Sequence, residues 1–193
     1  DVVVFPTASG TAANALALST MTPVFGNIYC HKLSHINTDE CGAPEFYTGG
    51  AKLITLNGVH GKITSEELEE KIGGFGIVHH TQPSSVSITQ LCETGDAYQL
   101  DEIKKISETA HKHNLNMHMD GARFANALVS LNTTPAEMTW ISQYLQLGEA
   151  RKSSSDTQNP SDFFSWLSIH LYFKILCPTC SKNQSEHFLI YQH

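Results

Sequence analysis

The sequence is poor in charged side chains, and basic residues are the scarcer kind. Among its 193 residues, lysine and arginine number 12 against 19 aspartates and glutamates, so the formal net charge is -7 with the 11 histidines neutral. A chain of this sign has no general electrostatic attraction for nucleic acid or for an anionic membrane surface. We therefore expect neither of these as a partner.

Cysteine is also scarce, and long apolar runs are missing. The five cysteines are odd in number and irregularly spaced, which does not indicate a disulfide framework. The apolar stretch at 163–176 is too short to span a bilayer. The opening residues lack the basic segment and cleavage pattern of a signal peptide. These absences favour a reducing, cytoplasmic compartment and argue against a membrane anchor.

What is present is an alternation of short apolar runs with helix-forming segments. Strands are predicted at Val2–Phe5, Asn27–Cys30, Lys52–Leu56 and Leu115–Met119. Helices are predicted at Ala12–Leu18, from the capping pattern at Thr64 through Lys71, and at Asp101–His113. This alternation predicts an α/β fold, with a mostly parallel sheet flanked by helices. The stretch 77–87 gives no clear pattern.

The most specific chemistry lies at residues 118–123. Asp120 follows a predicted strand, and ligands of open α/β sheets bind at such strand ends. Its carboxylate could meet a cationic ring nitrogen, while the guanidinium of Arg123 offers a fork for a carboxylate or phosphate. An Asp-Gly turn with a surface arginine explains the segment equally well when it is taken alone.

Two further segments carry polar groups. Ser9-Gly10-Thr11 precedes a predicted helix, where backbone N–H groups and hydroxyls can bind an anion or merely cap the helix. The polar run from His31 to Glu40 fits a solvated loop. His31 and His35 also have the spacing of a zinc pair, but the glutamate that accompanies such pairs is missing. We expect no metal.

Together these segments resemble the threonine aldolase and β-eliminating lyase family of pyridoxal-phosphate (PLP) enzymes. The matching stretches are 5–18, 31–53 and 118–131. The resemblance implies the large domain of the PLP-dependent transferase-like fold, here incomplete at both ends. It also implies a homo-oligomer, and an amino acid as the small-molecule substrate.

The resemblance assigns roles residue by residue. Ser9, Gly10 and Thr11 would hold the PLP phosphate. His35 would stack on the ring and serve in proton transfer at the substrate hydroxyl, with Glu40 orienting it. Asp120 would pair with the ring nitrogen, and Arg123 would contact the substrate carboxylate or the ring-oxygen side. A loosely aligned loop near the cofactor contains Thr89, Gln90, Glu93 and Thr94.

The implied reaction is the cleavage of a β-hydroxy amino acid such as threonine to glycine and an aldehyde. PLP serves as the electron sink in such chemistry. Two alternatives stay open on the sequence alone. One is another β-eliminating amino acid lyase with the same cofactor site, and the other is a non-catalytic module that binds PLP or a partner.

The resemblance fails where the family has the lysine that links covalently to PLP. Alignment on Gly148 puts Arg151 at that position, alignment on Trp140 puts Ser153 there, and Lys152 is one residue off in both. An arginine stays protonated and cannot replace this amine. We therefore divide the chain into a PLP-binding core at 1–140 and a divergent tail at 141–193. We expect the sheet to lose a strand after residue 140 and the chain to be inactive.

Overall fold

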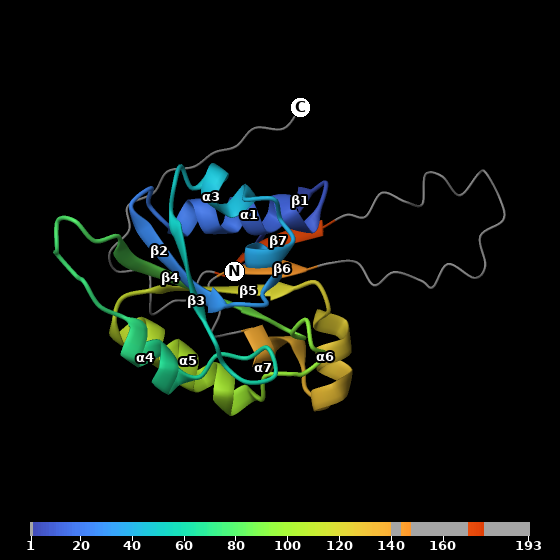
Figure 1. Ribbon diagram of the computed structural model, residues 1–193. Helices are drawn as coiled ribbons and strands as arrows, with labels where there is room; N and C mark the ends of the chain where they lie inside the picture. The colour runs from blue at the N-terminus through green and yellow to red at the C-terminus, as the bar shows by residue number, and fades with distance from the viewer. Residues whose placement is uncertain (1, 140–143, 148–169, 176–193) are drawn as a thin grey trace.

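The structure, a computed structural model, describes residues 2–139, 144–147 and 170–175, with side chains for residues 5–139. Its described strands form one seven-stranded sheet in the order β1-β7-β6-β5-β4-β2-β3 (Figure 1). In chain order the strands are Val2–Thr7, Gly26–His31, Lys52–Leu56, Gln82–Thr89, Asn116–Gly121, Tyr144–Leu147 and His170–Ile175. Strands β2 to β6 pair in parallel, whereas β7 runs antiparallel to β1 and β6. The predicted mostly parallel sheet is confirmed.

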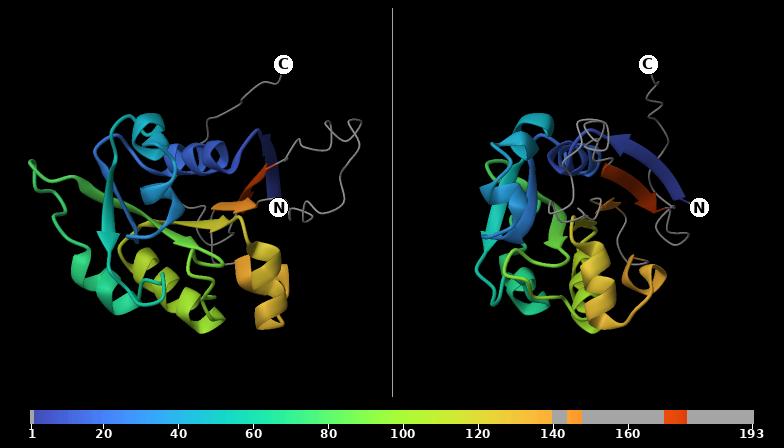
Figure 2. Two further views of the ribbon diagram at one scale, coloured as in Figure 1. Left: turned by 45° about the vertical axis from the view of Figure 1, so that its right-hand side comes forward. Right: turned by 90° about the vertical axis from the view of Figure 1, so that its right-hand side faces the viewer.

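Helices cover both faces of this sheet, as Figures 1 and 2 show. In chain order α1 to α7 span Gly10–Met21, His35–Thr38, Ala43–Tyr47, Ser65–Lys71, Leu100–Lys112, Phe124–Leu131 and Pro135–Thr139. Helices α1 and α3 lie on one face, and α4, α5, α6 and α7 lie on the other. None of the helices within the described ranges is long and apolar enough to cross a bilayer.

Local sequence explains where the helices begin. The Thr64 hydroxyl caps α4 by accepting from the N–H of Glu67 at 3.1 Å, as the capping pattern predicts. The Glu67 carboxylate does not complete the box, because it accepts from the N–H groups of Asn57 and Gly58 instead. It thereby ties the start of α4 to the turn that follows β3.

The two faces of the sheet carry separate apolar cores. Leu18 of α1 packs with Ile28 and Cys30 of β2 on one face. On the other face Tyr29 belongs to a larger core that α4, α5, α6 and α7 complete. Consecutive β2 residues thus point to opposite sides, and both sides are buried, as expected for a parallel strand between two layers of helices.

The same alternation in β5 places the candidate carboxylate. Met117 and Met119 enter the larger core. The intervening polar side chains therefore face α1, where Asn116 donates to the carbonyl of Met21 at 2.9 Å. Asp120 lies on this α1 side at the carboxyl end of the strand, where the sequence predicted it.

One sequence expectation differs from the structure, and one stretch that had no clear pattern receives an assignment. The sheet does not lose a strand after residue 140, because β6 and β7 join it there. The unclear stretch 77–87 contains a turn and the start of β4, which begins at Gln82 after a glycine-rich loop. The domain division at 140 stays a prediction. Arg151 and Ser153, which the two alignments put at the lysine position, lie outside the described residues, and so does Lys152.

Candidate active site

Asp120 is a buried carboxylate, with 4% of its surface exposed. Its Oδ1 accepts from the backbone N–H of Ala122 at 3.0 Å, and its Oδ2 accepts from Nδ2 of Asn14 at 3.0 Å. The first bond is local to the turn after β5. The second joins β5 to α1 across 106 residues of sequence, and it fixes the direction of the carboxylate.

Helix α1 begins with the predicted anion-binding segment. Ser9 caps the helix by accepting from the N–H of Ala12 at 3.1 Å, and the first turn contains no acidic residue. Gly10 and Thr11 lie in that first turn, where backbone N–H groups have no helical partner and the helix dipole favours an anion. Asn14, which binds Asp120, lies about 7.5 Å farther along the helix axis than Ser9, at ~1.5 Å per residue.

His35 reaches the same network through Glu40. Its Nδ1 lies 2.9 Å from Oε1 of Glu40, and that oxygen also accepts from Nδ2 of Asn14 at 2.7 Å. The side chain of Glu40 is fully buried, whereas 42% of the His35 side chain is exposed. The imidazole is therefore anchored on its inner edge and open on its outer side. Hydrogen bonds through Asn14 of α1 thus connect two of the predicted site segments, the polar run that ends at Glu40 and the strand end at Asp120.

Burial, hydrogen bonds and charges within this network shift the pKa values of Glu40 and His35. Burial raises the pKa of Glu40, and the hydrogen bonds from Asn14 and His35 offset part of that rise. Burial alone would lower the pKa of His35, but the hydrogen bond and charge of Glu40, with Asp120 and Asp39, raise it overall. The imidazole therefore holds its proton more firmly than a free histidine does.

Arg123 already has partners. Its Nη2 donates to Oε1 of Glu93 at 2.9 Å, and its Nε donates to the carbonyl of Leu91 at 3.1 Å. Burial raises the pKa of Glu93, and the guanidinium offsets part of that rise. A second carboxylate at this arginine must share the guanidinium with Glu93 or displace it.

The predicted loop near the cofactor begins at the last residue of β4, and its side chains have different partners. Thr89 is buried and pairs in register with Asp120. The Gln90 amide is committed to the backbone of Tyr98, donating to its carbonyl and accepting from its N–H, both at 2.9 Å. Thr94 donates to the carbonyl of His60 at 2.7 Å. Gln90 and Thr94 therefore hold the loop in place.

Sequence reasoning missed Asn14. It is 2% exposed and links Glu40 to Asp120, but it gave only the weak signal of one amide in an alanine-rich helix.

The zinc alternative for His31 and His35 does not fit the geometry. Both His31 ring nitrogens face backbone groups, the carbonyl of Asn57 and the N–H of Leu33.

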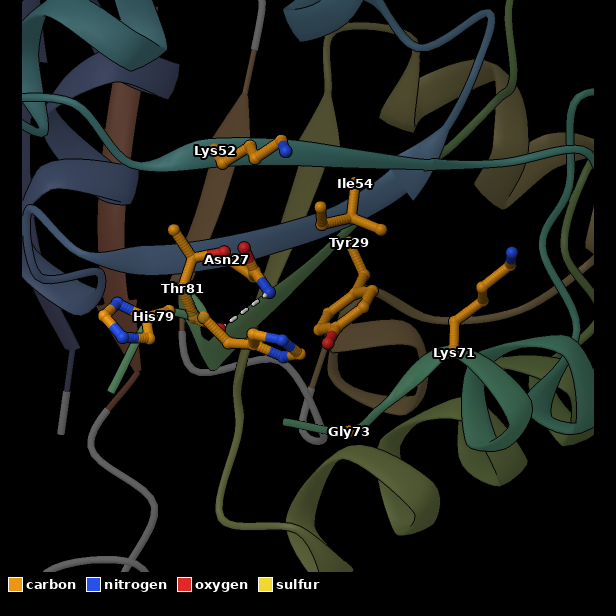
Figure 3. Close-up of a pocket in the computed structure, with 9 residues that line it drawn as sticks. Asn27, Tyr29, Lys52, Ile54, Lys71, Gly73, His79 and Thr81 are labelled. Atoms are coloured by element: carbon orange, nitrogen blue, oxygen red, sulfur yellow. Dashed lines mark hydrogen bonds between the residues drawn. The ribbon is translucent and has the colours of Figure 1, made fainter. Parts of the chain in front are cut away.

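A separate pocket of about 350 Å³ lies where β2 and β3 begin (Figure 3). Asn27 and Tyr29 line it from β2, Lys52 from β3 and Lys71 from α4. These strands run in parallel, so their starting ends lie at the edge of the sheet opposite to Asp120. None of its lining residues was predicted as a site residue, and it is distinct from the network around Asp120.

Comparison with known proteins identifies relatives of this chain. The family model described as beta-eliminating lyase matches residues 1–147, seven residues past the boundary expected at 140. A low specificity L-threonine aldolase of a Pseudomonas species is 46% identical over 140 residues, which cover 72% of this chain and 40% of that protein. This chain therefore spans less than half the length of that curated relative.

Solved structures agree on the fold. The threonine aldolase of Leishmania major superposes with a TM-score of 0.76 at 25% identity, covering 90% of this chain and 47% of that one. Aspartate aminotransferase from Thermus thermophilus superposes with a TM-score of 0.59 at 12% identity, covering 90% of this chain and 41% of its own. The second likeness concerns the fold alone.

Proposed function

This chain belongs to the beta-eliminating lyase family, and we propose that it supplies the PLP-binding core of a threonine-aldolase-type lyase. The observation that supports this most is the hydrogen bond from Asn14 to Asp120. It ties a buried carboxylate to Asn14, a residue that lies about 7.5 Å beyond Ser9 along the axis of α1. A group with a phosphate at one end and a cationic ring nitrogen at the other fits this spacing.

The donor set suits PLP. Ser9, Gly10 and Thr11 present a helix N-terminus without acidic residues to the phosphate. Asp120 presents a buried carboxylate to the ring nitrogen and would keep a proton on that atom. When bound, PLP acts as an electron sink that stabilises negative charge on the α-carbon of an amino acid.

The remaining groups of the site act on the substrate. His35 has an exposed outer side and an anchored Nδ1, so its ring can lie against the cofactor face and its Nε2 can exchange a proton with a substrate hydroxyl. Arg123 would orient the substrate carboxylate while it shares its guanidinium with Glu93. A β-hydroxy amino acid such as threonine supplies both partners, and the L-threonine aldolase relative supports this choice.

We also propose that the chain as given does not turn over substrate. Neither alignment of the lysine region puts a lysine at the family position. A displacement of about 1 Å can cost roughly a hundredfold in rate, and a whole residue is more than ~3 Å along an extended chain. Because the three cysteines within the described ranges are free, which fits a reducing compartment, we propose a cytoplasmic setting.

The test of the cofactor assignment is equilibrium binding of PLP, followed by absorbance and by dialysis. Asp120→Asn should weaken binding at least a hundredfold, because breaking a buried charge pair costs about 3–5 kcal/mol. The matched control is Asp101→Asn, which removes an exposed carboxylate whose partner is Lys105, one turn along α5. Equal PLP affinity in the two variants would contradict the assignment.

A further inference from the structure

The amide of Asn14 is shared between two buried carboxylates. Its Nδ2 lies 2.7 Å from Oε1 of Glu40 and 3.0 Å from Oδ2 of Asp120. The two oxygens are therefore no farther apart than the sum of these distances, and both side chains are buried. Two buried carboxylates this close oppose each other's ionisation.

Asn14 is suited to relieve that opposition. It is uncharged, it is itself 2% exposed, and one Nδ2 hydrogen can point to each carboxylate. Its amide hydrogen bond lowers the pKa of Glu40 against the rise caused by burial, and the charge of Asp120 acts in the opposite direction. Without this donor, the energetic balance at Glu40 shifts towards the protonated, neutral acid.

The ionisation of Glu40 in turn affects His35. Oε1 of Glu40 is the partner of the imidazole Nδ1 at 2.9 Å, and Glu40, Asp120 and Asp39 are the acidic groups that act on this histidine. A neutral Glu40 would remove the nearest of these charges. The imidazole would then lose its proton at a lower pH.

We propose that Asn14 is a positioning residue of this site, whose single side-chain amide binds Asp120 and Glu40 together and thereby fixes the carboxylate that orients the His35 imidazole and holds its proton. The residue joins the two ends of the proposed chemistry, the carboxylate for the ring nitrogen and the imidazole that would transfer a proton at the substrate hydroxyl. The inference rests on the proposed function for its role in PLP chemistry. The hydrogen-bond network itself belongs to the chain without cofactor and can be tested there.

The test is an NMR titration of the histidine side chains in the cofactor-free chain, with His35 assigned by comparison with His35→Gln. Asn14→Leu keeps roughly the side-chain volume and removes the donor. It should lower the pKa of His35 by about one unit or more, the usual effect of losing an opposite charge at about 4–6 Å. The matched control is Asn27→Leu, a buried asparagine of β2 that donates to the carbonyl of Thr81.

Three outcomes decide the proposal. A lower His35 pKa in Asn14→Leu alone supports it, and an unchanged value in a folded Asn14→Leu protein overturns it. If Asn14→Leu does not fold, the side-chain amide resonances of Asn14 in the unmodified chain are the measurement. They must shift as His35 titrates, and resonances that stay constant overturn the proposal.

PLP binding by the unmodified chain is measured separately. A failure there counts against the proposed function, and it leaves the His35 titration as a test of the network alone. If the unmodified chain binds PLP and Asn14→Leu lowers the pKa of His35, Asn14→Leu should also weaken PLP binding more than Asn27→Leu does, because Asp120 loses one of its two donors.

Discussion

Acid should destabilise this protein through His118, the histidine two residues before the candidate carboxylate. It is 0% exposed on β5, its Nδ1 lies 2.8 Å from the hydroxyl of Ser87, and its Nε2 has no hydrogen-bond partner in the part of the chain that the structure describes. Burial lowers the pKa of His118 to about 4, and the charge of Asp120 only partly offsets this effect. The folded protein therefore holds this imidazole neutral at pH 7.

The sign and size of the effect follow from linkage. The unfolded imidazole has a pKa of about 6.5, so unfolding takes up nearly one proton at pH values between that pKa and the folded one. The stability from the neutral histidine is present above pH ~6.5 and is lost as the pH falls towards about 4. Between pH 7 and pH 5 the loss is about 2 kcal/mol, or a shift of about 1 M in a urea midpoint.

The assay compares urea unfolding of the unmodified chain and His118→Asn at pH 7 and pH 5. The variant keeps a polar partner for Ser87 but has no imidazole to titrate. The raised pKa values of Glu40 and His35 make the folded state bind protons more readily, so they oppose the acid effect in both proteins and cancel in the comparison. If both proteins lose the same stability over this range, His118 is not held neutral by burial and the reasoning fails.

Three other expectations concern packing, turnover and assembly. The Tyr98 hydroxyl accepts from the buried N–H of Ile63 at 2.7 Å, so Tyr98→Phe should lower the free energy of unfolding by about 1–3 kcal/mol in urea titrations. With PLP and threonine, the chain should form glycine and acetaldehyde no faster than free PLP does, and turnover abolished by Lys152→Ala would refute the lysine alignment. Light scattering should detect at least a dimer, and a monomer that binds PLP fully would count against the proposed homo-oligomer.

The sequence could predict the parts of the fold whose cause is local. The strand Lys52–Leu56 agrees at both ends, and the capping pattern at Thr64 locates the start of α4. The strand predicted at Leu115–Met119 begins one residue later and ends two residues later in β5, but it keeps its alternation, which is why Asp120 could be placed at a strand end in advance.

The parts that escaped prediction depend on contacts between distant segments. Strand β7 inserts antiparallel between β1 and β6, and no local pattern in its residues indicates which strands it will pair with. Asn14 meets its two carboxylates 26 and 106 residues away, so its own neighbourhood of alanines and leucines contains no trace of them. The partner of Arg123 escaped for the same reason, since Glu93 lies 30 residues before it.

The charges of the assembled site support the proposed PLP ligand. Among the described residues, the charge of Asp120 acts on two other carboxylates, Glu40 and Glu93. Glu93 pairs with the guanidinium of Arg123, and Glu40 pairs with the imidazole of His35. Burial raises the pKa values of Glu40 and Glu93. The charge of Asp120 contributes to both rises, because the acidic groups repel one another. A cation placed at Asp120 would reduce this electrostatic repulsion, whereas an anion there would increase it. The protonated ring nitrogen of PLP is such a cation, and its phosphate would lie at the start of α1, where the first turn carries no acidic residue.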